Sequence, residues 1–372
     1  QDVLAALEAI GLSASAQRFS LILPLGISFF TLQAIGCAVD VYREKCPVPQ
    51  SAVHFCLFTS FFGFISSGPI TRAGSFLPQL QAPRRFDADK AVSGLVLMAQ
   101  GLLAKVCVAD LLAVIANGVW GDVRAYSGPV LALGALAYTF QLYFDFSGYS
   151  MLAQGCARVL GLELPQNFNT PYFSRSIKEF WRRWHMSLSA WLRDYVYIPL
   201  GGNRKGLPRQ ILNILIVWTL TGIWHGAGWN FLLWGAYFAV LLIVEKLFLY
   251  KWLQKAPAVL AHIYTMFFVC ISWLIFYFTD LGEGLTCLKA MFGVGVSSFA
   301  TPTVVYDLLR YLPLLAVCVL AATPLPKRIF DALKNRFVTM RYAQVLLLAG
   351  AFLVITAYLV DSTFSPFLYY RF

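Results

Sequence analysis

His225 is one of only four histidines in the 372-residue chain, and it lies within an almost uncharged stretch over 210–249. Ionisable side chains in such a stretch are costly and usually face the interior of a helix bundle or a water-filled cavity. On a helix, His225 shares its face with Trp218, Thr221 and Gly222, two of which are small enough to leave room beside the imidazole. An apolar cavity disfavours the charged imidazole, so a neutral His225 could accept a proton from a hydroxyl group that attacks an acyl carbonyl. The alternative is a neutral histidine bonded to a carbonyl of a neighbouring helix.

Two glycines directly follow this histidine. Gly226 and Gly228 interrupt the apolar stretch, and an interrupted span is where a helix can break to line a cavity. A metal cluster would require His54 and His262 as well, and neither has a carboxylate at ligand spacing, so we expect no metal. No GxSxG motif occurs, which leaves a serine hydrolase triad unsupported.

His185 lies in an amphipathic segment. Ser176 and Glu179 form a capping-box pattern that predicts a helix start. Apolar residues then recur at three- and four-residue steps, predicting one helix with one apolar stripe: Ile177, Phe180, Trp181, Trp184, Leu188, Trp191 and Leu192. A basic, tryptophan-rich helix of this kind lies along the membrane surface or dips partly inward. His185 falls at the edge of the stripe, where it is either an active-site residue or a bystander at headgroup level.

Other polar residues interrupt or border the apolar blocks. Asp145, within YFDFSGYS (143–150), either lines a cavity or has a structural role as a cap or ion-pair partner. Asp40 and Arg43, at the end of the first block, are expected to pair with each other at the interface. The segment 193–206 ends in a Gly-Gly turn with basic neighbours and lacks the GxxxxGK[ST] pattern of a phosphate loop.

The elements that would position these residues are membrane spans. The chain is 59% apolar and 13% charged, which excludes a disordered protein and disfavours a soluble enzyme. Apolar blocks of roughly membrane-spanning length predict an all-α, polytopic membrane protein with eight or nine spans in a single domain, residues 1–372. The blocks lie at about 20–41, 52–71, 91–116, 128–157, 210–225, 229–249, 258–279, 308–323 and 343–360. Residues 165–209 form the amphipathic or re-entrant segment on the cytoplasmic side.

The net charge of +11 comes from the loops between the blocks. The positive-inside rule puts the basic loops 72–90, 175–209 and 327–341 on the cytoplasmic side and the acidic loop 280–307 outside. So hydrophobic a chain does not resemble a nucleic-acid-binding module. The eight cysteines form no CxxC pair and are expected to be buried thiols. The chain begins with Gln1 and shows no signal peptide, and we expect a trimmed N-terminus.

Four segments together resemble the membrane-bound O-acyltransferase family, in particular its bacterial polysaccharide O-acetyltransferase branch, typified by the alginate-acetylating membrane protein. They are LPLGISFFTLQAIGCAVDVYR (23–43), YFDFSGYSMLAQGCARVLGLELPQNFNTPY (143–172), FWRRWHMSLSAWLRDYVYIPLGGNRKG (180–206) and GIWHGAGWNFLLWGAYF (222–238). The resemblance covers about residues 20–250. The family's usual first spans are missing here, which again suggests an incomplete N-terminus.

The resemblance implies that His225 is the family's invariant histidine and His185 its second active-site position. It also implies a helical fold around a tunnel, located in the bacterial cytoplasmic (inner) membrane. The acyl donor, acetyl-CoA or another acyl thioester, would enter from the cytoplasm, and no tightly bound cofactor is expected. The acetyl group would pass to a polysaccharide acceptor or to an extracytoplasmic partner transferase.

On this interpretation the chain is an acetyltransferase with His225 as general base and His185 assisting. The candidate donor- and substrate-binding residues are Arg182, Trp184, Arg193, Arg204, Lys205 and Asp145. D-alanyl transfer to teichoic acid and acetyl transfer to peptidoglycan are alternatives within the same chemistry. A transporter using His225 and Asp145 as a proton relay is the alternative from another class, although no inverted repeat supports it.

Overall fold

The computed structural model describes residues 26–83, 85–295, 301–337 and 339–361. These residues form helices and loops with no β-strand among them, which confirms the all-α prediction. The helices are α2 (Ile27–Tyr42), α3 (Ala52–Ser60), α4 (Ala73–Gln81), α5 (Ala88–Leu102), η1 (Leu103–Ala109), α6 (Asp110–Trp120), α7 (Gly128–Val159), η2 (Pro171–Phe173), α8 (Ile177–Arg183), α9 (Met186–Leu192), η3 (Arg193–Tyr197), α10 (Gly206–His225), α11 (Trp229–Val244), η4 (Glu245–Leu249), α12 (Tyr250–Lys255), α13 (Ala258–Tyr277), α14 (Leu281–Met291), α15 (Pro302–Ala321), α16 (Leu325–Arg336) and α17 (Thr339–Asp361).

Six helical runs among the described residues are long and apolar enough to cross a membrane, which makes the chain a multi-pass membrane protein. They are Ala88–Trp120, Gly128–Val159, Trp229–Lys255, Ala258–Tyr277, Pro302–Ala321 and Ala343–Val360. The predicted count of eight or nine is not confirmed. The block at 52–71 yields only the nine-residue α3 followed by an irregular loop, and the first block yields the 16-residue α2.

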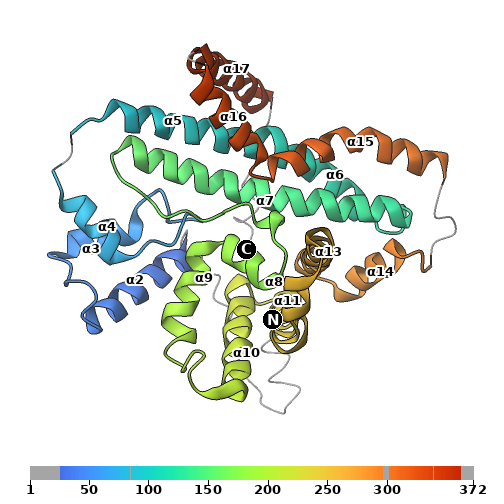
Figure 1. Cartoon of the computed structure of the whole chain (residues 1–372), viewed down its shortest axis with the longest axis horizontal. Coiled ribbons are helices and arrows are strands. Elements are labelled where there is room, and N and C mark those ends of the chain that lie inside the picture. Colours follow the sequence, from blue (N-terminus) through green and yellow to red (C-terminus); the bar gives the residue numbers. More distant parts are fainter. Residues whose placement is uncertain (1–25, 84, 296–300, 338, 362–372) are drawn as a thin grey trace, which may run out of the picture.

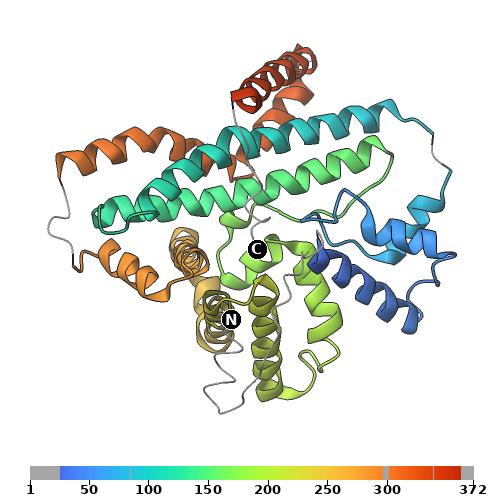
Figure 2. The same ribbon diagram turned by 180° about the vertical axis from the view of Figure 1, so that it is seen from behind.

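The run from α5 to α6 lies antiparallel to α7, and both cross the whole width of the molecule (Figures 1 and 2). Glycines allow the two backbones to approach closely. A Cβ atom on Gly101 would lie 2.5 Å from the carbonyl oxygen of Gly148, and one on Gly94 would lie 2.7 Å from that of Gly155. Small residues at such positions let membrane helices pack backbone to backbone. The packed pair forms a layer that covers one side of the helices that carry the histidines.

Helices α10 and α11 form a hairpin on the other side of α7 (Figure 1). Glycines again set the contact, since a Cβ on Gly222 would lie 2.5 Å from the carbonyl oxygen of Phe231. Helix α10 ends at His225, Gly226 has φ 155°, and α11 begins at Trp229. The predicted break after His225 is therefore confirmed.

The prediction of one continuous amphipathic helix beyond Ser176 is wrong. Ser176 does cap the start, accepting a hydrogen bond from the Glu179 N–H at 3.0 Å, but α8 ends at Arg183. Trp184 is extended, His185 has a left-handed backbone with φ 42°, and α9 begins at Met186. Most of the apolar stripe packs into the protein core rather than against lipid, because Phe180, Trp184 and Trp191 are buried.

Candidate active site

His225 ends α10 in an aromatic pocket and is 8% exposed. Its ring centroid lies 4.9 Å from those of Trp224 and Trp234 and 5.2 Å from that of Phe276. These contacts bring together the end of α10, the second turn of α11 and the end of α13. The helix break places the imidazole where α10 stops and before α11 begins, so the position of His225 depends on the hairpin contact.

His185 is even more deeply buried, with 2% of its surface exposed. Its Nδ1 lies 3.1 Å from the side-chain oxygen of Asn167, and its ring packs at 4.8 Å against Phe146 of α7. This burial argues against a bystander that is exposed to lipid headgroups. Burial, and after it the neighbouring His225, hold the pKa of the His185 imidazole well below its ordinary value.

Trp224 connects the two histidines. Its ring centroid lies 6.1 Å from that of His185 and 4.9 Å from that of His225, its neighbour in the chain. The 180–206 and 222–238 segments thus bring two buried imidazoles into contact with one indole. The remaining histidines lie elsewhere, His54 beside Ser51 and His262 beside the Ser174 carbonyl.

The predicted binding residues divide into two groups. Arg182, Arg193, Arg204 and Lys205 are exposed, and Arg193 bonds to Asp194 at 2.7 Å. Trp184 is buried in the aromatic core, with its centroid 5.0 Å from that of Trp273 and 5.1 Å from that of Phe168. The basic side chains therefore lie at the surface, whereas Trp184 packs beside the histidine that follows it.

Asp145 is buried in an ion pair. Its Oδ1 lies 2.7 Å from Lys105 Nζ, which also lies 2.7 Å from Asp110 Oδ1. Lys105 belongs to η1, a short π-helical turn between α5 and α6. Of the two roles considered for Asp145, this geometry corresponds to structural pairing.

The prediction that Asp40 and Arg43 pair with each other is wrong. Asp40 accepts a 2.6 Å hydrogen bond from the Tyr195 hydroxyl, and Arg43 donates to the carbonyl oxygen of Asp194. Arg72 binds the Asp194 carboxylate at 3.0 Å. Both residues at the end of α2 thus bind η3 in preference to each other, because the fold brings a phenol and a free carbonyl within reach. This contact joins α2 to the segment that carries His185.

Three buried polar residues, one of which contacts His185, escaped the sequence analysis. Asn167 has no local pattern that would reveal it. Lys105 and Glu245 do, because each is an ionisable residue inside an apolar block, 91–116 and 229–249 respectively. The Glu245 carboxylate accepts hydrogen bonds from the backbone N–H groups of Ile177 at 2.6 Å and Lys178 at 3.0 Å. A carboxylate at a helix N-terminus satisfies unpaired N–H groups and the helix dipole, so Glu245 anchors α8.

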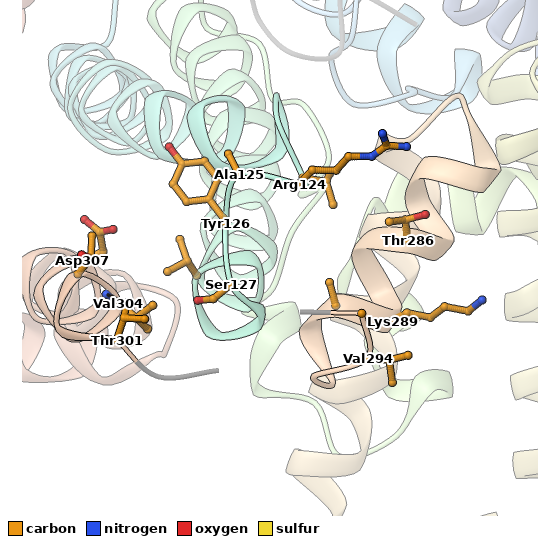
Figure 3. A pocket seen from close by; sticks show the side chains of 15 residues that line it. Arg124, Ala125, Tyr126, Ser127, Thr286, Lys289, Val294, Thr301, Val304 and Asp307 are labelled. Carbon is orange, nitrogen blue, oxygen red and sulfur yellow. Dashed lines mark hydrogen bonds between the residues drawn. The ribbon is translucent and has the colours of Figure 1, made fainter. Parts of the chain in front are cut away.

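A cavity of about 850 Å³ opens between the 123–127 turn, α14 and the start of α15. Figure 3 shows Val304 and Asp307 of α15, with the cap residue Thr301, on one side of Tyr126 and Ser127, and the α14 residue Lys289 on the other. The cavity lining from Thr286 to Asp307 belongs to the loop 280–307, which the sequence predicts to be outside the cell. Neither His185 nor His225 lines it.

Comparison with known proteins identifies the family. Residues 47–286 match the membrane-bound O-acyltransferase family, and both buried histidines lie in this range. The chain is 40% identical over 278 residues to a probable alginate O-acetylase, AlgI, of Azotobacter vinelandii, covering 74% of this chain and 55% of the relative. It is 36% identical over 311 residues to a peptidoglycan O-acetyltransferase of Helicobacter pylori, covering 76% of this chain and 59% of the relative.

A more distant relative is a teichoic acid D-alanyltransferase of Bacillus subtilis, 32% identical over 278 residues and covered to 68% in both chains. The chain spans about half the length of the alginate relatives it matches. The family match covers more than half of the residues, including His185 and the helix that ends at His225. The chain therefore belongs to the membrane-bound O-acyltransferase family.

Proposed function

We propose that the chain is an O-acyltransferase that moves an acetyl group from a cytoplasmic thioester to an exported, alginate-like polysaccharide. The observation that carries the proposal is the pair of buried imidazoles that both contact Trp224, within the residues that match the family. The names of the alginate O-acetylase relatives support the choice of acceptor.

In the proposed reaction His225 is the general base. It accepts the proton of an acceptor hydroxyl as the hydroxyl oxygen attacks the acyl carbonyl, forming the new ester C–O bond. The C–S bond of the thioester then breaks, and the thiolate takes up the proton. His185 assists by positioning or by sharing the proton. The aromatic walls around both imidazoles exclude water, which would otherwise hydrolyse the thioester.

The donor is acetyl-CoA or another acyl thioester. Its phosphate groups bind the exposed cations Arg182, Arg193, Arg204 and Lys205 at the cytoplasmic face. The acetyl group leaves on the other side of the bacterial inner membrane, where a polysaccharide or a partner transferase receives it. Trp184 supports the aromatic wall, and Asp145 holds its helix through Lys105.

The test is the substitution His225→Ala in the full-length protein, in membranes or proteoliposomes supplied with labelled acetyl thioester and polysaccharide. We expect loss of acetyl transfer by a factor of at least about 100, the usual range of general base catalysis, with normal insertion. Full transfer by an inserted His225→Ala variant would refute the assignment.

The similarity to two relatives with other acceptors supports a second candidate function. The peptidoglycan and teichoic acid enzymes are relatives over similar lengths of the chain, so the same site could serve peptidoglycan acetylation or D-alanyl transfer. Offering the three acceptors and both acyl groups to one preparation separates these activities. Counterflow of a solute without acyl transfer would instead favour the transporter alternative.

A further inference from the structure

Asn167 lies in the loop between α7 and η2 and contacts His185. The asparagine is buried, and its side-chain oxygen has three neighbours at hydrogen-bond distance: His185 Nδ1 at 3.1 Å, Ser187 N at 3.2 Å and Ser187 Oγ at 2.9 Å. Its side-chain nitrogen donates to Ser150 Oγ at 3.2 Å. A backbone N–H can only donate, so the atom facing Ser187 N must be the amide oxygen. The hydrogen bonds therefore fix which way the amide group points.

The orientation of the amide determines the tautomer of His185. An amide oxygen only accepts, so His185 Nδ1 must carry a hydrogen. Because burial disfavours the charged ring, the imidazole is neutral and has one hydrogen. The lone pair is therefore on Nε2, at the edge of the ring away from Asn167.

We propose that Asn167 is a positioning residue of the acyl-transfer site that selects the Nδ1–H tautomer of His185 and thereby makes Nε2 its proton-accepting nitrogen. This inference rests on the proposed function, and it gives the assisting histidine a defined basic atom. An Nε2–H tautomer would present a donor there and could not share the proton that His225 takes from the acceptor hydroxyl.

Asn167 also holds the backbone at His185. Its carbonyl oxygen accepts from Met186 N at 2.9 Å, while its side chain accepts from Ser187 N. These are the first two N–H groups of α9, which have no partner inside the helix. Asn167 therefore caps α9 from outside and stabilises the left-handed backbone at His185. Ring orientation and tautomer are thus determined by the same residue.

The charges around His185 are few in the part of the chain that the structure describes. Phe146 of α7 and Trp224 of α10 pack against the ring, and His225 is the titratable group whose charge acts on it. The carboxylate of Asp145, adjacent to Phe146, is paired with Lys105. A new negative charge at position 167 would therefore dominate the titration of His185.

The direct experiment is nuclear magnetic resonance of the full chain, labelled with ¹⁵N-histidine and placed in lipid nanodiscs. With four histidines in the chain, the His185 signals can be assigned by comparison with His185→Gln. We expect a neutral Nδ1–H imidazole at pH 7. A neutral Nε2–H form of His185 in the unsubstituted protein would overturn the proposal, whatever reaction the protein catalyses.

The second measurement is the pH dependence of kcat/KM for acyl transfer. Asn167→Asp keeps the accepting oxygen and adds a negative charge, which favours the imidazolium and raises the pKa of His185. Because neutral His185 is the competent form, the acid limb should move to higher pH, by about 1 to 3 units for a carboxylate in direct contact. Asn167→Leu removes the acceptor, and its kcat should fall by about 100-fold.

Ser150→Ala is the matched control. It removes a hydrogen bond from the same buried network without altering the oxygen that faces His185. We expect some loss of stability and an unchanged acid limb. An acid limb that does not move in active Asn167→Asp, or that moves equally in Ser150→Ala, would show a merely structural role. Absence of acyl transfer by the unsubstituted protein would refute the proposed function alone, since the tautomer is measured independently.

Discussion

The buried ion pair between Lys105 and Asp145 allows a quantitative prediction about stability. Their side chains are 7% and 2% exposed, and the lysine lies between two carboxylates at 2.7 Å. The informative change is Lys105→Met, which keeps the length and apolar stem of the side chain and removes the charge. Asp145 then loses the cation that faces it in the helix layer.

The expected magnitude follows from opposing terms. At 2.7 Å and an effective dielectric constant of about 20, one pair contributes about 6 kcal/mol of attraction. Burying the two ions costs several kcal/mol each, so the intact pair contributes little net stability. Removing one partner leaves the burial cost of the other, and we expect Lys105→Met to lower the free energy of unfolding by about 3–5 kcal/mol. Lys105→Met combined with Asp145→Leu should recover most of this loss.

The measurement is unfolding in mixed micelles, followed by the loss of helical signal as the fraction of denaturing detergent rises. The control is Arg158→Ala, which breaks the 3.0 Å pair with Glu163 at the exposed end of α7. Exposed pairs contribute only about 0–1 kcal/mol, so this variant should unfold almost like the parent protein.

Two results would refute this reasoning. One is a Lys105→Met variant as stable as the parent, and the other is a double variant no more stable than the single one. The double variant also separates the two roles considered for Asp145. If the role is structural, the refolded double variant retains acyl transfer. If Asp145 binds substrate, transfer is lost although stability recovers.

Two further predictions concern the hairpin and the basic surface. Gly222→Ala would place a Cβ 2.5 Å from the Phe231 carbonyl oxygen. The resulting strain of about 1–3 kcal/mol should displace His225 and lower acyl transfer about tenfold. The control is Gly118→Ala, whose Cβ would have nothing within 4 Å, and equal activity of the two variants would contradict this prediction. Joint replacement of Arg204 and Lys205 by alanine should raise KM for the donor severalfold. The effect should shrink at high salt, because these cations are exposed. An equal rise in KM when Lys327 and Arg328 are replaced by alanine would argue against a local phosphate site.

The sequence revealed those features that depend on local pattern. The apolar blocks from 91 onward match helical runs, and the glycines after His225 correctly predicted the end of α10. The Ser176 cap was also predictable, because its partner lies three residues away. Each of these signals lies within a window of about twenty residues.

The features that escaped prediction depend on contacts between distant residues. The helix ends before His185 because Asn167, 18 residues earlier, binds the next two N–H groups. The apolar periodicity continues through this break and gives no warning of it. Lys105 likewise meets Asp145 across 40 positions, and Asp40 chooses Tyr195 over the nearby Arg43. Such choices depend on packing that one sequence does not display.

The left-handed backbone at His185 restricts which amino acids can occupy this position. Among residues other than glycine, asparagine, aspartate and histidine adopt this conformation most readily, whereas a β-branched side chain is strained there. His185→Val would therefore change the chain path and the chemistry together, while His185→Asn would keep the path and remove the imidazole. The fold itself narrows this site to a few short polar side chains, before any requirement for proton transfer is added.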